Sequence, residues 1–261
     1  MARTDAIERR IVARGDVRIE VLAQGRGRLV VLLPSLGRAS EDFDHLAARL
    51  AAAGYRALRP APRGIGASSG PMTGITLHDL ARDVAAVIEA EGGGPAIVAG
   101  HAFGNWVART TAADRPDLVR AVVLLAAAHR NYPQAVRDQL TKCLDLSAPR
   151  DERLAALRQV FFAPDNDPTG WLEGWHPEVA RAQRTAGAAT PTEEWWSAGA
   201  APILDVQARE DAFAPHAGSG KLRAELGERV TIAVIPGAGH ALLPEQPEAV
   251  ADAVLGYLAR L

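Results

Sequence analysis

The segment Ile97-Val98-Ala99-Gly100-His101-Ala102-Phe103-Gly104-Asn105-Trp106 decides how this chain folds. An apolar run leads into Gly-His-Ala-Phe-Gly, and a helical pattern follows without an intervening loop. Continuous apolar runs are typical of strands in a parallel sheet, because both faces of such a sheet are covered. Glycines allow a sharp turn from strand to helix. The segment therefore predicts a buried strand, a tight turn and a helix over about residues 103–114.

Strands and helices alternate on both sides of this segment. Apolar runs predict strands at 29–33, 55–58, 121–125, 203–206 and 230–235, with helices over about 41–53, 77–91 and 246–261 between and after them. Thr76-Leu77-His78-Asp79 is a capping-box pattern, which predicts that the helix over 77–91 begins here. Residues 11–12 and 17–22 flank Arg14-Gly15-Asp16 and predict an antiparallel hairpin. The chain is therefore expected to be an α/β protein with a mainly parallel sheet, an N-terminal antiparallel hairpin and helices on both faces.

Residues 129–200 interrupt this alternation. They contain Trp171, Trp175, Trp195 and Trp196, and Leu154, Leu157 and Phe161 follow helical spacing. A structureless loop of this length is uncommon inside a compact domain. We therefore expect a helical cap at 129–200 on a core made of 1–128 and 201–261. Its aromatic residues either form the cap's own interior or line a pocket, and for the pocket we expect Trp175, His176 and Trp196.

The composition argues against several classes of protein. The 29 Lys+Arg and 31 Asp+Glu residues give a formal net charge of -2, whereas a nucleic-acid binder needs a cationic excess. No apolar run reaches the roughly 18 residues of a membrane span. The N-terminus lacks the apolar centre of a signal peptide, and the single cysteine, Cys143, cannot form an internal disulfide. We expect a cytoplasmic protein without nucleic-acid or membrane partners.

Four segments together resemble the α/β-hydrolase superfamily, in its capped, single-domain bacterial type. With serine in place of Ala102, residues 100–104 would be the G-x-S-x-G nucleophile elbow. Arg-Gly-Ile-Gly-Ala-Ser at 63–68 resembles the family's R-G-x-G-x-S loop. Gln-Ala-Arg-Glu-Asp at 207–211 matches the site of the catalytic acid, and Ile-Pro-Gly-Ala-Gly-His at 235–240 resembles the catalytic-histidine loop. The four segments stand in the family's order and span nearly the whole chain.

The resemblance implies a role for several residues of this chain. His240 would be the general base and Asp211 the acid that orients it. The backbone N–H groups of Phe103 and Leu36 would form an oxyanion hole. Ala102 would occupy the nucleophile position, so that Ala102, Asp211 and His240 keep the family's chain order of nucleophile, acid and histidine.

Ala102 is the departure from this pattern, because its side chain has no nucleophilic atom. It is either the natural residue or an engineered replacement of serine. The family commonly has His-Gly where this chain has Pro34-Ser35, and aspartate where it has Ala61. These further differences favour natural divergence, since an engineered knockout would not alter them as well.

Three other residues are candidates for a part in the chemistry. Ser35 is interpreted as a turn serine beside the pocket, with a displaced nucleophile as the alternative. Cys143 is interpreted as a small buried apolar residue rather than a nucleophile. His101 is interpreted as structural.

We therefore expect an enzyme that acts on a small apolar molecule, at an ester, amide, lactone or carbon–carbon bond, with a His-Asp base and no serine. The alternative is a ligand-binding relative without catalysis, although a binding pocket has no need of an oriented base. Neither residues 64–66 nor 92–94 open a helix after a strand, as phosphate cradles do, and no Cys/His set has zinc spacing. No cofactor and no metal are expected. The expected partner is a small-molecule substrate, and the sequence specifies no oligomeric state.

Overall fold

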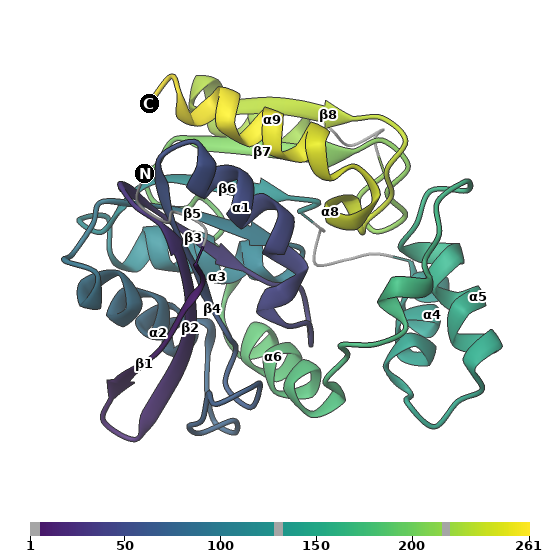
Figure 1. The fold of residues 1–261 in the computed structure, drawn as a ribbon. Helices are drawn as coiled ribbons and strands as arrows, with labels where there is room; N and C mark the ends of the chain where they lie inside the picture. Colours follow the sequence, from purple (N-terminus) through teal and green to yellow (C-terminus); the bar gives the residue numbers. More distant parts are fainter. Residues whose placement is uncertain (1–5, 128–132, 216–219) are drawn as a thin grey trace.

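The strand that ends before Ala102 lies inside a mainly parallel sheet. The computed structural model describes residues 6–127, 133–215 and 220–261 (Figure 1). In these ranges eight strands form one sheet in the order β1-β2-β4-β3-β5-β6-β7-β8. Their bounds are β1 Glu8–Arg14, β2 Val17–Gly25, β3 Arg28–Leu33, β4 Tyr55–Pro60, β5 Ala96–His101, β6 Val119–Leu125, β7 Ile203–Ala208 and β8 Val230–Ile235.

The pairing of these strands confirms the predicted fold class. β1 pairs with β2 antiparallel from Glu8↔Ala23 to Arg14↔Val17, which leaves Gly15 and Asp16 as the hairpin turn. β2 also pairs antiparallel with β4, and every later neighbour pair is parallel. The expected strand at 96–99 continues to His101, so that it ends directly at the turn.

Helices cover both faces of the sheet, as expected. On one face α2 (Leu77–Ala90) and α3 (Phe103–Asp114) pack in one hydrophobic cluster with residues such as Val31 and Val98. On the other face α1 (Asp44–Ala52) and α9 (Pro247–Leu258) pack with their strand neighbours, such as Leu32 and Ile97. The strand residues of the two clusters alternate along each strand, because successive side chains of a strand point to opposite faces of the sheet.

Two helix starts differ in how well the sequence predicted them. α2 begins at the expected capping box, in which the Thr76 N–H donates to Asp79 Oδ2 at 2.9 Å. The helix expected at 41–53 instead begins as a 3-10 turn at Ser40–Phe43 and continues as α1. Helix ends often tighten into 3-10 turns, which periodicity alone does not show.

The segment between β6 and β7 is helical where it is described. It contains α4 (Gln134–Leu144), α5 (Arg150–Val160) and α6 (Pro177–Ala189), with 3-10 turns at Thr169–Trp171 and Thr192–Glu194. Figure 1 shows α4 and α5 as a pair beside the sheet, with α6 closer to the strands. The expected boundary at 128/129 lies outside the described residues.

The buried residues of this segment pack in two different places. Cys143, Leu157, Phe161 and Trp171 form a hydrophobic cluster that also includes Phe213 from the loop after β7. Trp195 and Ala198 instead pack in the cluster that contains α2, α3 and the sheet. Two short helices complete the described chain, α7 (Lys221–Leu226) and α8 (Leu242–Glu245). None of the described helices has the length and hydropathy needed to cross a membrane.

Candidate active site

Ala102 occupies a strained turn between β5 and α3. Its φ of 46° and ψ of -112° are rare for a residue with a side chain. The turn is tight because a Cβ at Gly104 would lie 2.3 Å from the Leu33 carbonyl oxygen, and one at Gly100 would lie 2.2 Å from the Gly104 carbonyl. Backbone strain of this kind typically costs about 1–3 kcal/mol and clusters at functional sites. The turn is therefore a candidate site on geometry alone.

His240 and Asp211 meet at the same edge of the sheet as this turn. Asp211 follows β7 and His240 follows β8, and the carboxyl ends of neighbouring parallel strands lie together. His240 Nδ1 lies 2.9 Å from Asp211 Oδ2, and both side chains are buried. The other oxygen, Asp211 Oδ1, accepts hydrogen bonds from the N–H groups of Phe213 at 2.7 Å and Ala214 at 3.1 Å.

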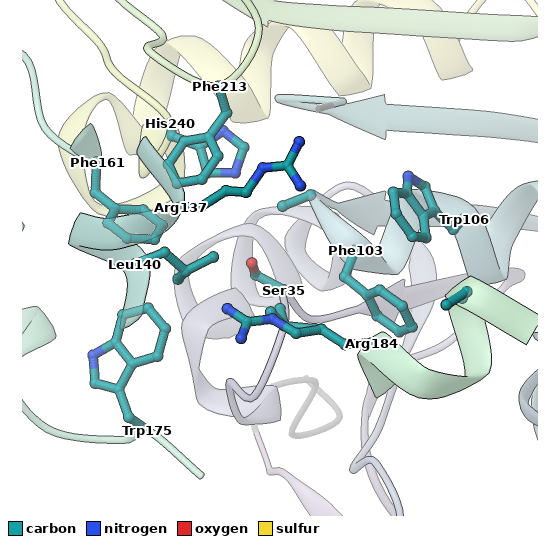
Figure 2. Close-up of a pocket in the computed structure, with 14 residues that line it drawn as sticks. Ser35, Phe103, Trp106, Arg137, Leu140, Phe161, Trp175, Arg184, Phe213 and His240 are labelled. Atoms are coloured by element: carbon teal, nitrogen blue, oxygen red, sulfur yellow. The ribbon is translucent and has the colours of Figure 1, made fainter. Parts of the chain in front are cut away.

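This arrangement determines which nitrogen of His240 is available to a ligand. An ionised carboxylate only accepts hydrogen bonds, so Nδ1 donates its proton to Asp211 and Nε2 keeps its lone pair. The Phe213 ring stacks on the imidazole with ring centroids 4.2 Å apart. Figure 2 shows the two rings lying against each other. The imidazole is thereby held as an oriented base.

His101 supports the backbone of His240. Its Nε2 lies 2.7 Å from the His240 carbonyl oxygen, to which it donates. The side chain is fully buried, and burial lowers its pKa to about 3, so the ring stays neutral. Within the described chain, its Nδ1 has no hydrogen-bond partner. This contact agrees with a structural role for His101.

The loop that carries His240 is joined to the helical segment. The Ala241 N–H donates to the Phe161 carbonyl at 2.8 Å, and the Gly239 N–H donates to Glu245 Oε2 at 2.8 Å. Glu245 Oε1 in turn accepts from the Ala163 N–H at 2.6 Å and from Asn166 Nδ2 at 2.7 Å. Burial raises the pKa of Glu245. The position of the imidazole thus depends on residues 161–166.

The loop after β3 is attached to α6 in a similar way. The Gly37 N–H donates to Gln183 Oε1 at 2.8 Å, and the Gly37 carbonyl accepts from the His176 N–H at 2.8 Å. The neighbouring Leu36 N–H and the Phe103 N–H donate to no acceptor in the described part of the chain. Two amides are therefore available beside Ala102.

A cavity of about 350 Å³ lies between the turn at Ala102, the loop after β3 and the loop that carries His240 (Figure 2). Of the residues expected at the site, it brings together Ala102, Phe103, Leu36, Ser35, Trp175 and His240. Asp211 does not line it and reaches it only through His240. Trp175 also stacks against Arg38, whose guanidinium lies 4.9 Å from its ring centroid.

Two residues expected in the pocket lie elsewhere. His176 lines a separate cavity of about 510 Å³ with Arg38 and Glu173. Trp196 lines a small third cavity, where the Arg109 guanidinium lies 4.4 Å from its ring centroid. Aromatic content alone does not show which way a ring faces, and this depends on how the segment packs.

Several residues of the cavity were not anticipated from the sequence: Trp106, Arg137, Leu140, Phe161, Arg184, Gly187, Ala188 and Phe213. Spacing groups Arg137 with Leu140, and Arg184 with Gly187 and Ala188, on single helix faces. Nothing in the sequence shows that these faces turn toward Ala102. Cys143 is buried outside the cavity lining, and burial raises its thiol pKa to about 12.

Residues 6–127, 133–215 and 220–261 contain no group of three or more His, Cys, Asp or Glu side chains arranged to hold a metal ion.

The fold and the arrangement of Ala102, Asp211 and His240 define a class of protein, which comparison with known proteins identifies. Residues 30–253 match the alpha/beta hydrolase family, and the chain belongs to this family. It is 25% identical to the 2-(acetamidomethylene)succinate hydrolase of Mesorhizobium japonicum, over 94% of this chain and 92% of that protein. It is 26% identical to the non-heme chloroperoxidase of Streptomyces lividans, over 84% and 87%.

A solved structure supports the same fold. The crystal structure of E-2-(acetamidomethylene)succinate hydrolase superposes with a TM-score of 0.79 at 22% identity. The match covers 97% of this chain and 100% of that one. The relatives thus include hydrolases and a peroxidase.

Proposed function

We propose that the protein is a hydrolase that acts on a small apolar organic molecule, at an ester, amide, lactone or carbon–carbon bond, without a serine nucleophile. The observation that supports this most is the 2.9 Å contact between His240 Nδ1 and Asp211, with His240 lining the same cavity as Ala102. An oriented base is of no use to a protein that only binds a ligand. We also propose that residues 129–200 act as a cap, since α4 and α6 supply part of the cavity wall.

The proposed reaction uses water as the nucleophile, because Ala102 has none. For an ester, His240 Nε2 takes a proton from water while the water oxygen bonds to the carbonyl carbon. The N–H groups of Phe103 and Leu36 stabilise the oxyanion. The tetrahedral intermediate then breaks its bond to the alkoxy oxygen, which takes the proton back from His240. An acid and an alcohol leave, and no step needs a cofactor.

Each group contributes a different amount to this scheme. General-base assistance typically contributes about 10²–10⁴-fold to the rate. Removing one oxyanion-hole donor from a serine protease typically lowers kcat by about 10²–10³-fold. Asp211 acts through His240, by keeping the proton on Nδ1 and by stabilising the imidazolium.

A second candidate function is favoured by one observation, which is that Ala102 stands where the family has serine. The chain would then be a ligand-binding relative that has lost catalysis, or a serine hydrolase whose nucleophile was replaced. Both alternatives predict no turnover by this chain with alanine at residue 102.

A substrate panel of esters, amides and lactones separates these readings. The unaltered chain should turn over some member of the panel, and His240→Ala should lower that turnover by roughly 10²–10⁴-fold. Cys143→Ala is the matched control, because Cys143 is buried outside the cavity lining, and should leave turnover nearly unchanged.

Three outcomes would overturn the proposal. Full activity of His240→Ala would place the chemistry elsewhere. Loss of activity in Ser35→Ala, with an acyl adduct on Ser35 in the mass spectrum, would make that hydroxyl the nucleophile. Turnover by Ala102→Ser alone, with none by the unaltered chain, would identify a replaced or lost serine.

A further inference from the structure

Among the described residues, the Lys, Arg, Asp and Glu side chains that line the cavity are all arginines. Arg137 and Arg184 line the cavity, and no aspartate or glutamate of the described chain does. The other lining groups are the His240 imidazole, the Ser35 hydroxyl and mainly apolar side chains, including Phe103, Trp106, Leu140, Phe161, Trp175 and Phe213. An apolar cavity that holds two cations suits an apolar molecule that carries negative charge.

The two arginines approach from different helices. Arg137 lies on α4, three residues before Leu140, and both line the cavity. Arg184 lies on α6, three and four residues before Gly187 and Ala188, which also line it. Figure 2 shows both side chains extending into the same space, with Ser35 between them in this view.

Among the described residues, no neighbouring carboxylate neutralises Arg184. No described carboxylate oxygen lies within ion-pair distance of it, whereas Arg181, one turn earlier on α6, pairs with Glu178 at 3.5 Å. Gly187 allows α6 to lie close to Trp106 in the cavity wall, since a Cβ at Gly187 would lie 2.7 Å from the Trp106 ring. The guanidinium of Arg184 is thereby available to an anion in the cavity.

We propose that this cavity selects organic molecules that carry a carboxylate, which Arg184 binds with support from Arg137. A guanidinium matches a carboxylate in two parallel hydrogen bonds, and such charge-assisted bonds are stronger than neutral ones. The aromatic walls hold the apolar body of the molecule. The inference rests on the proposed function in that it treats the bound molecule as the substrate. Its carboxylate is then a recognition group, separate from the bond that reacts at His240.

Binding of acids and their neutral amides tests this directly. The pairs are benzoate with benzamide, phenylacetate with phenylacetamide, and indole-3-acetate with indole-3-acetamide, titrated calorimetrically at pH 7.5. We expect at least one acid to bind roughly tenfold more tightly than its amide, a difference of about 1.4 kcal/mol. Raising the salt concentration from roughly 0.05 M to 0.5 M should weaken the binding of the acid and leave the binding of the amide nearly unchanged.

Variants on α4 and α6 assign the preference to its residues. Arg184→Gln should bring the acid-to-amide ratio close to one while changing the affinity for the amide by less than about twofold. Arg137→Gln should reduce the ratio partly. Arg181→Gln is the matched control, because Arg181 lies on the same helix outside the cavity lining, and should keep the ratio. The thermal transition of each variant shows whether it is folded.

The outcomes separate this inference from the proposed function. No binding of any acid, equal affinity for acids and amides, or a ratio retained in a folded Arg184→Gln would overturn the inference, even if the substrate panel shows turnover. A preference that disappears in Arg184→Gln would support it even if the panel shows none, since binding needs no catalysis. In that second case the proposed function alone would fail.

Discussion

Gly104 determines how closely α3 approaches the end of β3. A Cβ added there would meet the carbonyl oxygens of Leu33 at 2.3 Å and Pro34 at 2.7 Å, and backbone atoms cannot move aside as a flexible side chain can. The Leu36 and Phe103 amides lie on the two segments that this contact joins. The geometry of the candidate oxyanion hole thus depends on the absence of a side chain at residue 104.

We predict that Gly104→Ala lowers the free energy of unfolding by about 3 kcal/mol, because overpacking a rigid site typically costs about 1–3 kcal/mol and the backbone here adds to it. Urea unfolding followed by circular dichroism measures the change. Gly170→Ala is the control, since a Cβ at Gly170 has no heavy atom within 4 Å. Equal stability of the two variants would contradict the prediction.

His101 makes stability depend on pH through its burial. Its pKa is lowered to about 3 in the folded chain, whereas a histidine in an unfolded chain titrates near 6.5. Between these two values the unfolded state binds a proton that the folded state does not. The free energy of unfolding therefore falls as the pH falls below about 6.5.

The expected loss from this group is about 2 kcal/mol between pH 6.5 and pH 5, at roughly 1.4 kcal/mol per unit. His101→Gln keeps an N–H donor for the His240 carbonyl but does not titrate, so its stability should fall less steeply over this range. Urea unfolding at a series of pH values gives both slopes. Identical slopes for the two proteins would show that His101 is not the cause.

At the scale of elements, α6 connects the loop after β3 to the cavity wall. Gln183 accepts from the Gly37 N–H at 2.8 Å and is buried, while its neighbour Arg184 lines the cavity. One helix therefore influences both the position of the Leu36 amide and the charge inside the cavity. A movement of α6 would change both together.

Gln183→Leu should destabilise the loop at 35–38. The Gly37 N–H would lose its acceptor, and a buried unsatisfied donor costs about 1–3 kcal/mol. We expect faster amide hydrogen exchange at 35–38, with exchange in β8 unchanged, and lower turnover. Thr185→Ala on the exposed side of α6 is the control and should leave the exchange as it was. Unaltered exchange at Gly37 in Gln183→Leu would reject the link.

At the scale of the whole molecule, the helical segment and the sheet share buried residues. Trp195 is fully buried and packs in the cluster of α2, α3 and the sheet, and its ring stacks on Trp106 with centroids 5.3 Å apart. Trp106 in turn lines the cavity. The end of the helical segment is therefore part of the main hydrophobic core.

Trp195→Ala should lower the free energy of unfolding of the whole chain by about 3–5 kcal/mol, the usual cost of removing a large buried aromatic side chain. Because the residue packs against the sheet, circular dichroism and tryptophan fluorescence should report one coincident transition at a lower urea concentration. Leu146→Ala is the control, at a side chain that is 52% exposed. An unchanged sheet transition in Trp195→Ala would mean that the segment unfolds on its own.

Much of the fold follows from patterns that are local in the sequence. Apolar runs and helical spacing predicted the strand and helix order, and the capping box at Thr76 predicted where α2 begins. The contact between Asp211 and His240 was instead expected from the resemblance to the α/β-hydrolase superfamily. The structure supplies its physical reason, because each residue follows a parallel strand and neighbouring parallel strands end at the same edge of the sheet.

The sequence by itself determined the α/β class, the turn at Ala102 and the segments that carry Asp211 and His240, because each depends on residues close together in the chain. Only the tertiary structure decided what else lines the cavity. It turned Arg137 and Arg184 toward Ala102, left His176 and Trp196 in other cavities, and brought His101 to the carbonyl of His240, 139 residues away. The physical reason is that the faces of α4 and α6 are chosen by packing between distant segments, which periodicity within one helix does not encode.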